Sequence, residues 1–87
     1  MSTKHGSHPD IIKRLRRAEG HLRSVIAMME EGRHCLDLAQ QIHAVEAAIS
    51  KAKRELIQDH IENCLEDGSS RETKASLAEL KQLAKYL

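Results

Sequence analysis

The feature that most constrains this chain is the segment from Cys35 to Glu66, which contains neither glycine nor proline. Within it, apolar side chains recur at alternating steps of four and three residues, at Leu38, Ile42, Val45, Ile49, Ala52 and Leu56. This heptad spacing is typical of a long helix that packs lengthwise against other helices. No part of the chain shows the strict alternation that marks a strand, so we predict an all-α fold.

The residues before this segment predict another helix. It opens near Pro9 and Asp10, which suit the first turn of a helix, and Gly32 can close it. Its apolar stripe has the same spacing and consists of Ile11, Leu15, Ala18, Leu22, Val25 and Met29. We expect a mobile N-terminal tail over residues 1–8 and a single helical domain over residues 9–87.

A third, shorter helix is expected after the break at Asp67 to Ser70. Ser69 and Glu72 have the spacing of a capping box, in which each side chain bonds to the backbone N–H of the other residue. Apolar residues follow at helical spacing, at Leu77, Leu80, Ala84 and Leu87. The protomer is therefore predicted to contain three helices.

The size of the chain indicates that subunits associate. A domain of 87 residues buries only about two-thirds of its unfolded surface, and two cysteines cannot form the several disulfides that stabilise small secreted domains. The segment from Met1 to Gly20 has no apolar run long enough for a signal peptide or a membrane span. We therefore expect a cytoplasmic homo-oligomer with reduced thiols and no membrane partner.

Charge is distributed unevenly along the chain, although the formal net charge is only +1. Between Ile11 and Ile26 the chain carries a basic cluster against the single acidic residue Glu19, and this cluster consists of Lys13, Arg14, Arg16, Arg17 and Arg23. Such a run on one helix is usually a solvated face. Repeated in several subunits, however, it forms a broad positive surface that can neutralise DNA phosphates.

Three residues of the long segment are candidate metal ligands. His60 and Cys64 stand one helical turn apart, so both side chains can reach one metal ion, although Cys64 can equally be read as a continuation of the apolar stripe. Cys35 begins the same helix roughly 37 Å away and cannot share that ion within one chain. Two copies packed antiparallel would bring Cys35 of one chain to His60 and Cys64 of the other, crossing near the small residues Ala47 and Ala48.

The chain resembles the metal-sensing repressor family that includes the copper-sensitive operon repressor, the nickel/cobalt repressor and formaldehyde sensors (the CsoR/RcnR family). The resemblance rests on three segments at family spacing: the run from Arg14 to Arg23, Cys35 followed by Gln40 to Val45, and Asp59-His60 with Cys64. It implies a three-helix protomer, a dimer of dimers, and a metal site in which Cys35 faces His60 and Cys64 of the partner.

The resemblance also implies roles for residues outside the ligand set. By the family's pattern, DNA-contacting basic residues fall at Arg14 and Lys51, with Arg54 one turn beyond Lys51. From the basic cluster itself we also expect Arg16 and Arg17 to contact DNA. Glu79 matches a carboxylate that supports the metal-bound histidine. His34 and Lys51 stand where copper sensors tend to have tyrosine and arginine, so the surroundings of the metal differ and another metal can be selected.

The identity of the metal stays open between two alternatives. Two thiolates and one imidazole, from Cys35, Cys64 and His60, suit Cu(I). A fourth ligand from the tail, His5 or His8, would complete a set for Ni(II) or Co(II), as an N-terminal histidine does in the nickel/cobalt branch. His21 and His43 are expected to be structural.

The predicted function is that of a metal-responsive transcriptional repressor. Its metal-free form binds double-stranded operator DNA, and one metal ion per site causes release and so derepresses metal-export genes. One alternative is a thiol-based repressor in which Cys35 reacts with an aldehyde, or in which Cys35 and Cys64 respond to persulfides or form a disulfide. Another is a helical assembly module that does not bind DNA. An enzyme is not expected, because no nucleophile, base and oxyanion site occur together.

Overall fold

The computed structural model describes residues 8–67 and 73–87. It contains three helices, α1 (His8–Glu30), α2 (Cys35–Asp67) and α3 (Thr73–Ala84), and no strand occurs within these residues. The predicted all-α class and three-helix protomer are therefore confirmed. Ser69 and Glu72 of the expected capping box, and the residues of the expected tail before His8, lie outside the described residues.

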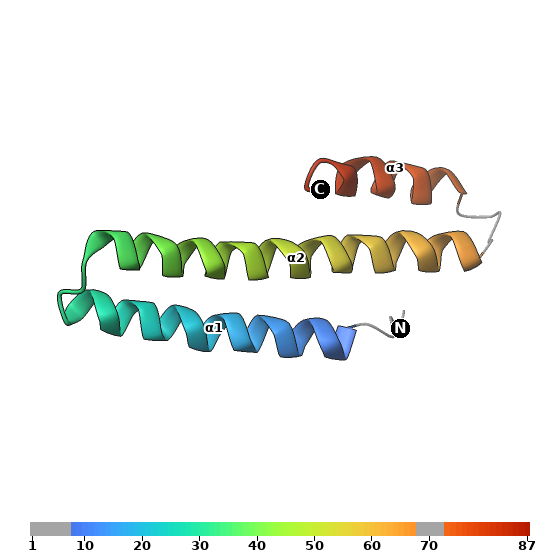
Figure 1. The fold of residues 1–87 in the computed structure, drawn as a ribbon. Helices are drawn as coiled ribbons and strands as arrows, with labels where there is room; N and C mark the ends of the chain where they lie inside the picture. The colour runs from blue at the N-terminus through green and yellow to red at the C-terminus, as the bar shows by residue number, and fades with distance from the viewer. Residues whose placement is uncertain (1–7, 68–72) are drawn as a thin grey trace.

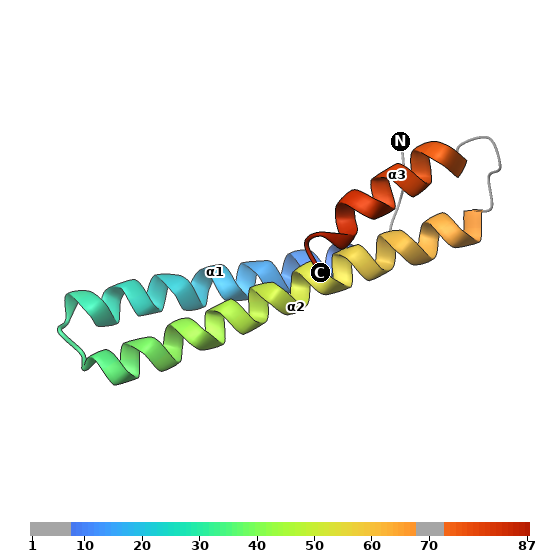
Figure 2. The ribbon, with the colours of Figure 1, turned by 90° about the horizontal axis from the view of Figure 1, so that it is seen from above.

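The helices form an elongated molecule, with principal extents of 57 × 23 × 14 Å. Helices α1 and α2 run antiparallel as a hairpin, and α2 extends well beyond the start of α1 (Figure 1). Helix α3 folds back along the C-terminal half of α2, as both views show (Figure 2). None of the helices in the described ranges combines the length and the apolar character that a membrane span requires.

The turn between α1 and α2 is built around Gly32, whose φ of 82° lies in the left-handed region. The Gly32 N–H donates to the carbonyl oxygen of Met29, and the Arg33 N–H donates to that of Met28, both at 3.1 Å. These two bonds define a Schellman motif, which satisfies carbonyl groups at the end of a helix and favours glycine at its left-handed position. The predicted closing role of Gly32 is confirmed.

The hairpin buries one row of side chains from each helix, with one residue buried every two turns. The buried row consists of Ile11, Ala18 and Val25 on α1, and of Leu38, Val45 and Ala52 on α2. Val25, Leu38 and Val45 form a packed cluster against which Met28 also lies. The interface between α1 and α2 thus accounts for half of each heptad stripe.

The other half of each stripe is exposed to solvent in the protomer. These residues are 37 to 53% exposed and comprise Leu15, Leu22 and Met29 on α1, and Ile42, Ile49 and Leu56 on α2. The expectation that each whole stripe packs against another helix is therefore met only in part within one chain. The reason is geometric, because each helix of a two-helix hairpin turns only one row toward its neighbour. We refer to Ile42, Ile49 and Leu56 as the outer row of α2.

Helix α3 lies along the C-terminal half of α2, and its C-terminal end reaches the level of the start of α1 (Figure 1). Ile57 on α2 is 2% exposed, and it lines a pocket together with Leu83 of α3. The predicted stripe of this helix is wrong at its end, because α3 stops at Ala84 and Leu87 is 62% exposed. The last three residues instead form tight turns, in which the Leu87 N–H donates to the Ala84 carbonyl oxygen at 3.3 Å.

Candidate metal centre and nucleic-acid interface

His60 and Glu79 meet between α2 and α3. Nε2 of His60 lies 3.1 Å from Oε1 of Glu79, and the His60 side chain is 24% exposed. Because a carboxylate oxygen accepts, Nε2 carries the proton and donates it. The bond fixes the orientation of the imidazole, which is the role of a carboxylate behind a metal-binding histidine.

A pocket of about 160 Å³ adjoins this pair, and side chains from all three helices line it. Its lining residues are His8, Leu56, Ile57, His60, Glu79 and Leu83. The first residue of α1 is thus placed beside the candidate metal-binding histidine. His8 was predicted only as an alternative to His5 for the fourth ligand, and His5 lies outside the described residues.

The other candidate ligands are distributed along α2. Cys35 is the first residue of the helix and is exposed. Cys64 lies in the helix one turn after His60. Because α2 is continuous from Cys35 to Asp67, Cys35 and His60 are separated by about 37 Å, and among the described residues of one chain no three metal-binding side chains come together.

His34 lies immediately before α2 and is exposed. Its carbonyl oxygen accepts a hydrogen bond from the N–H of Leu38 at 3.0 Å, so the residue takes part in starting the helix. Within one chain it is remote from the pair of His60 and Glu79. Any influence of His34 on a metal would have to act beside Cys35.

Cys35, His60 and the outer row of α2 lie on the same flank of the helix. Successive residues turn by about 100°, so residues separated by seven stay within about 20° of one another. Cys35 stands seven residues before Ile42, and His60 stands four after Leu56, which is about one turn. The candidate ligands therefore extend the exposed apolar row at both ends.

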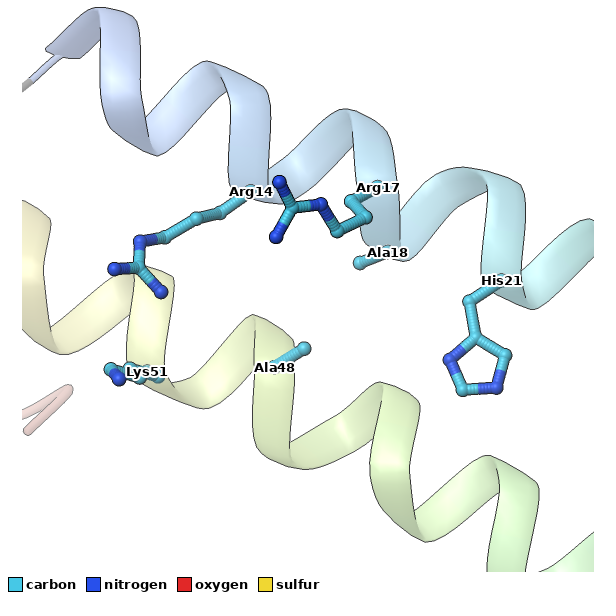
Figure 3. Close-up of a pocket in the computed structure, with 6 residues that line it drawn as sticks. All are labelled: Arg14, Arg17, Ala18, His21, Ala48 and Lys51. Atoms are coloured by element: carbon cyan, nitrogen blue, oxygen red, sulfur yellow. The ribbon is translucent and has the colours of Figure 1, made fainter.

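The predicted DNA-binding residues are partly brought together in a second pocket. It has a volume of about 260 Å³, lies between α1 and α2, and is lined by Arg14, Arg17, Ala18, His21, Ala48 and Lys51 (Figure 3). In Figure 3 the side chains of Arg14 and His21 reach from α1 toward α2, and the side chain of Arg17 runs along α1 toward Arg14. We refer to this feature as the basic pocket. Ala48, which we expected at a crossing of two α2 helices, lines this pocket.

The remaining predicted DNA-contacting residues lie outside the basic pocket. Arg16 is exposed on α1, and Nη1 of Arg54 donates to the hydroxyl of Ser50 at 3.2 Å. At the pocket itself, Nε of Arg14 forms an ion pair with Oε1 of Glu55 at 3.2 Å. The charge of Arg14 is thus shared with a carboxylate, a contact that spacing along the sequence did not reveal.

His21 forms a side-chain link between the two long helices. Its Nε2 lies 2.6 Å from Oε1 of Gln41, and the pair is half-buried. The amide oxygen accepts, so Nε2 of His21 donates. This geometry agrees with the structural role expected for His21 and also places the residue in the wall of the basic pocket.

The basic pocket and the outer row of α2 lie on opposite flanks of the hairpin. Measured in the direction of the chain, Lys51 lies about 200° around the helix from Ile49, and Ala48, which is one residue before Ile49, lies at about 260°. Ala52, which faces α1, is turned by about 300°, so the buried row separates the two flanks. One flank is apolar and carries the candidate metal ligands, and the other is basic.

Residues 7–86 match the family model described as metal-sensitive transcriptional repressor. The chain belongs to this family, whose members are transcriptional regulators.

Individual relatives extend this result. The chain is 32% identical to the copper-sensing transcriptional repressor RicR of Mycobacterium tuberculosis (strain ATCC 25618 / H37Rv), across 92% of this chain and 97% of RicR. It is 36% identical to the copper-sensing transcriptional repressor CsoR of Bacillus subtilis (strain 168), across 86% of this chain and 75% of CsoR. The nickel-responsive transcriptional regulator InrS has the same fold, with a TM-score of 0.82, 30% identity and full coverage of both chains. These matches favour metal sensing over the thiol-based alternative.

Proposed function

We propose that this protein binds operator DNA in its metal-free form and releases it when Ni(II), Co(II) or Cu(I) binds between two subunits. The repressor acts in the cytoplasm as a homotetramer built from two antiparallel dimers, and release permits transcription of metal-export genes. Family membership supports the class of protein. The arrangement of side chains along α2 supports a metal site shared between chains.

The observation that carries the shared site is the symmetry of the outer row about Ile49. If two α2 helices pack antiparallel with Ile49 at the centre, Ile42 of each chain meets Leu56 of the other, and the exposed row is covered. In this arrangement Cys35 faces Asn63 of the second chain, because the two residues are equally distant from Ile49. In the sequence, Asn63 lies between His60 and Cys64. An antiparallel pair of α2 helices centred on Ile49 therefore covers the apolar outer row and also brings Cys35 of one chain close to His60 and Cys64 of the other.

The ligand set follows from this pairing. Cys35 of one chain joins His60 and Cys64 of the other, and His60 binds through Nδ1 because its Nε2 donates to Glu79. His8 lines the pocket beside His60 and can add a second imidazole. We therefore prefer His8 to His5 as the fourth ligand. A set of two thiolates and two imidazoles favours nickel or cobalt, and loss of the second imidazole leaves a site suited to Cu(I).

Helix α2 provides the physical connection between metal and DNA. Lys51 of the basic pocket and His60 lie on this one helix, about 13 Å apart along its axis. Binding of a metal to Cys35 and His60 of different chains restrains the two α2 helices relative to each other, and thereby shifts Lys51 relative to the arginines of α1. Such couplings are typically about 1–3 kcal/mol, and they act equally in both directions between metal and DNA.

The test uses dimers that mix two variants carrying different affinity tags. Cys35→Ala and His60→Ala proteins should each bind operator DNA but fail to release it with Ni(II). In a dimer containing one chain of each variant, one site loses both residues and the other keeps its full ligand set. Anaerobic titration should then recover about one tight site per dimer.

Two controls make this result specific. A doubly tagged dimer with Cys35→Ala in both chains should recover no tight site, and His43→Ala, an exposed histidine of the same helix, should behave as the wild type. Parallel titrations with Cu(I), Co(II) and Zn(II) rank the metals. Failure of the mixed dimer to bind metal would refute the shared site and would move thiol sensing ahead.

A further inference from the structure

The ion pair of Arg14 with Glu55 places a carboxylate beside the basic pocket. Nε of Arg14 lies 3.2 Å from Oε1 of Glu55, and the two side chains are 43% and 32% exposed. The Arg14 side chain reaches from α1 toward α2 to make this contact (Figure 3). The protein therefore partly neutralises one of its own DNA-binding charges.

We propose that Glu55 competes with DNA for Arg14, and that metal binding strengthens the ion pair and thereby promotes release of DNA. This inference rests on the proposed function, because it names the contact through which metal binding weakens the hold on DNA. The residues expected to contact DNA are all basic, whereas Glu55 is a carboxylate that regulates one of them.

The competition follows from the position of the carboxylate. Glu55 contacts the same guanidinium group that a phosphate would bind, so it shares the positive charge and repels the phosphate. Glu55 also stands one helical turn after Lys51 on α2, where its charge opposes that of the lysine. Binding of a phosphate at Arg14 therefore requires the ion pair to weaken or break.

A second carboxylate near Arg14 differs in one respect. Asp10 lines a recess of about 200 Å³ together with Lys13, Arg14 and Arg17, but it lies on α1, one turn before Arg14. A movement of α1 relative to α2 therefore changes the separation of Arg14 and Glu55, while Asp10 moves together with Arg14. Of the two carboxylates, Glu55 is the one that responds to the relative position of the helices.

The candidate metal centre adjoins this ion pair on both helices. His8 and His60 line one pocket, so a metal ion bound by both would connect α1 to α2. Arg14 follows His8 by six residues, which is about 9 Å along α1. Glu55 precedes His60 by five residues, which is about 8 Å along α2. The ion pair is therefore close to the point where a metal would join the two helices.

A connection between the helices should strengthen a partly exposed ion pair. Such pairs contribute little by themselves, because formation restricts two long side chains and water screens the charges. A metal ion that joins α1 to α2 nearby removes part of this freedom in advance, so the pair forms more completely. The link between His21 and Gln41 holds the hairpin farther from the metal centre.

The test measures DNA affinity of the full-length protein with and without Ni(II). The probe is the anisotropy of a fluorescent 40-bp duplex at low salt, where phosphate contacts dominate binding. Glu55→Gln should raise the affinity of the metal-free protein about two- to fivefold, the effect expected for a partly exposed ion pair. The gain should be larger in the Ni(II)-loaded protein, so Ni(II) should weaken DNA binding less in Glu55→Gln than in the wild type.

Two control variants separate the ion pair from a general effect of charge. Asp10→Asn removes the same charge near Arg14 but within one helix, so DNA affinity should rise equally with and without Ni(II). In an Arg14→Gln background, Glu55→Gln should change DNA affinity less than twofold, because its partner is already absent. A gain of affinity also guards against variants that merely fold poorly.

A measurement without DNA completes the test. If metal strengthens the ion pair, the pair strengthens metal binding by the same factor. The Ni(II) affinity of Glu55→Gln, measured with a chromophoric chelator, should therefore fall by the factor that separates its two gains in DNA affinity. Equal gains with and without Ni(II), or a gain that persists in the Arg14→Gln background, would overturn the proposal. A wild type that keeps the duplex when loaded with Ni(II) would instead refute the repressor mechanism itself.

Discussion

His60 on α2 and Glu79 on α3 are hydrogen-bonded at 3.1 Å, although nineteen residues separate them in the chain. This contact ties the short third helix to the candidate metal centre. It fixes which ring nitrogen carries the proton and holds the imidazole beside the pocket that His8 enters. Helix α3 therefore has a function beyond covering Ile57.

Removal of this carboxylate should weaken metal binding while sparing DNA binding. Glu79→Gln is expected to lower Ni(II) affinity about 10- to 100-fold, the usual effect of losing the partner of a metal-binding histidine. Competition with a chromophoric chelator measures the affinity, and duplex anisotropy measures DNA binding. Glu62→Gln removes an exposed carboxylate near His60 and should bind Ni(II) as the wild type does. Equal losses in both variants would indicate a general charge effect.

Association of subunits should depend on Ile49. Ile49→Asp places a charge at the centre of the outer row and should convert the oligomer to monomer at micromolar concentration, as measured by sedimentation velocity. Ala47→Asp adds the same charge two residues earlier, about 200° around the helix, and should leave the assembly intact. Dissociation in Ala47→Asp but not in Ile49→Asp would place the interface on the opposite face of α2.

The two glycines of the hairpin should respond in opposite directions to alanine. Gly32→Ala forces a side chain into a φ of 82° and should lower the free energy of unfolding by about 1–2 kcal/mol. Gly20 lies within α1 with no atom within 4 Å of an added Cβ, so Gly20→Ala should raise that free energy by about 0.5–1 kcal/mol. Urea unfolding at one protein concentration measures both. A loss in Gly20→Ala would indicate that another subunit occupies this space.

The link between His21 and Gln41 should contribute measurably to packing of α1 against α2. A double-mutant cycle of His21→Ala and Gln41→Ala is expected to give a coupling of about 0.5–1.5 kcal/mol. The exposed pair of Glu19 and Arg23, 3.6 Å apart on one helix, provides the comparison and should give less than about 0.5 kcal/mol. Equal couplings would show that the contact across the hairpin is no stronger than a surface ion pair.

Periodicity predicted the helices because their signals are local. The starts and ends of α1 and α2 follow from Pro9, Gly32 and the uninterrupted segment after Cys35, and the structure agrees closely. Periodicity could not tell which row of each stripe is buried within the protomer. Val45 and Ile49 are equally apolar, and only the direction of the neighbouring helix decides that Val45 is 4% and Ile49 45% exposed.

Contacts between residues on different helices could not be predicted from the spacing of residues along the sequence. Ile57 falls outside the predicted stripe and is buried, and the pocket that it lines is completed by His8 of α1 and Leu83 of α3. The pairing of Glu79 with His60 was expected only through resemblance to a family, since no spacing rule connects residues on different helices. The ion pair of Arg14 with Glu55 was not expected at all.

Each heptad stripe is divided into a buried row and an exposed row, and this division also determines the order in which the two rows are covered during folding. The hairpin of α1 and α2 joins segments adjacent in the chain through a short turn at Gly32, so its formation is unimolecular and fast. Coverage of Ile42, Ile49 and Leu56 requires a collision with a second chain. Refolding from urea should therefore show a rapid phase that is independent of protein concentration, followed by a slower phase whose rate increases as the protein is concentrated.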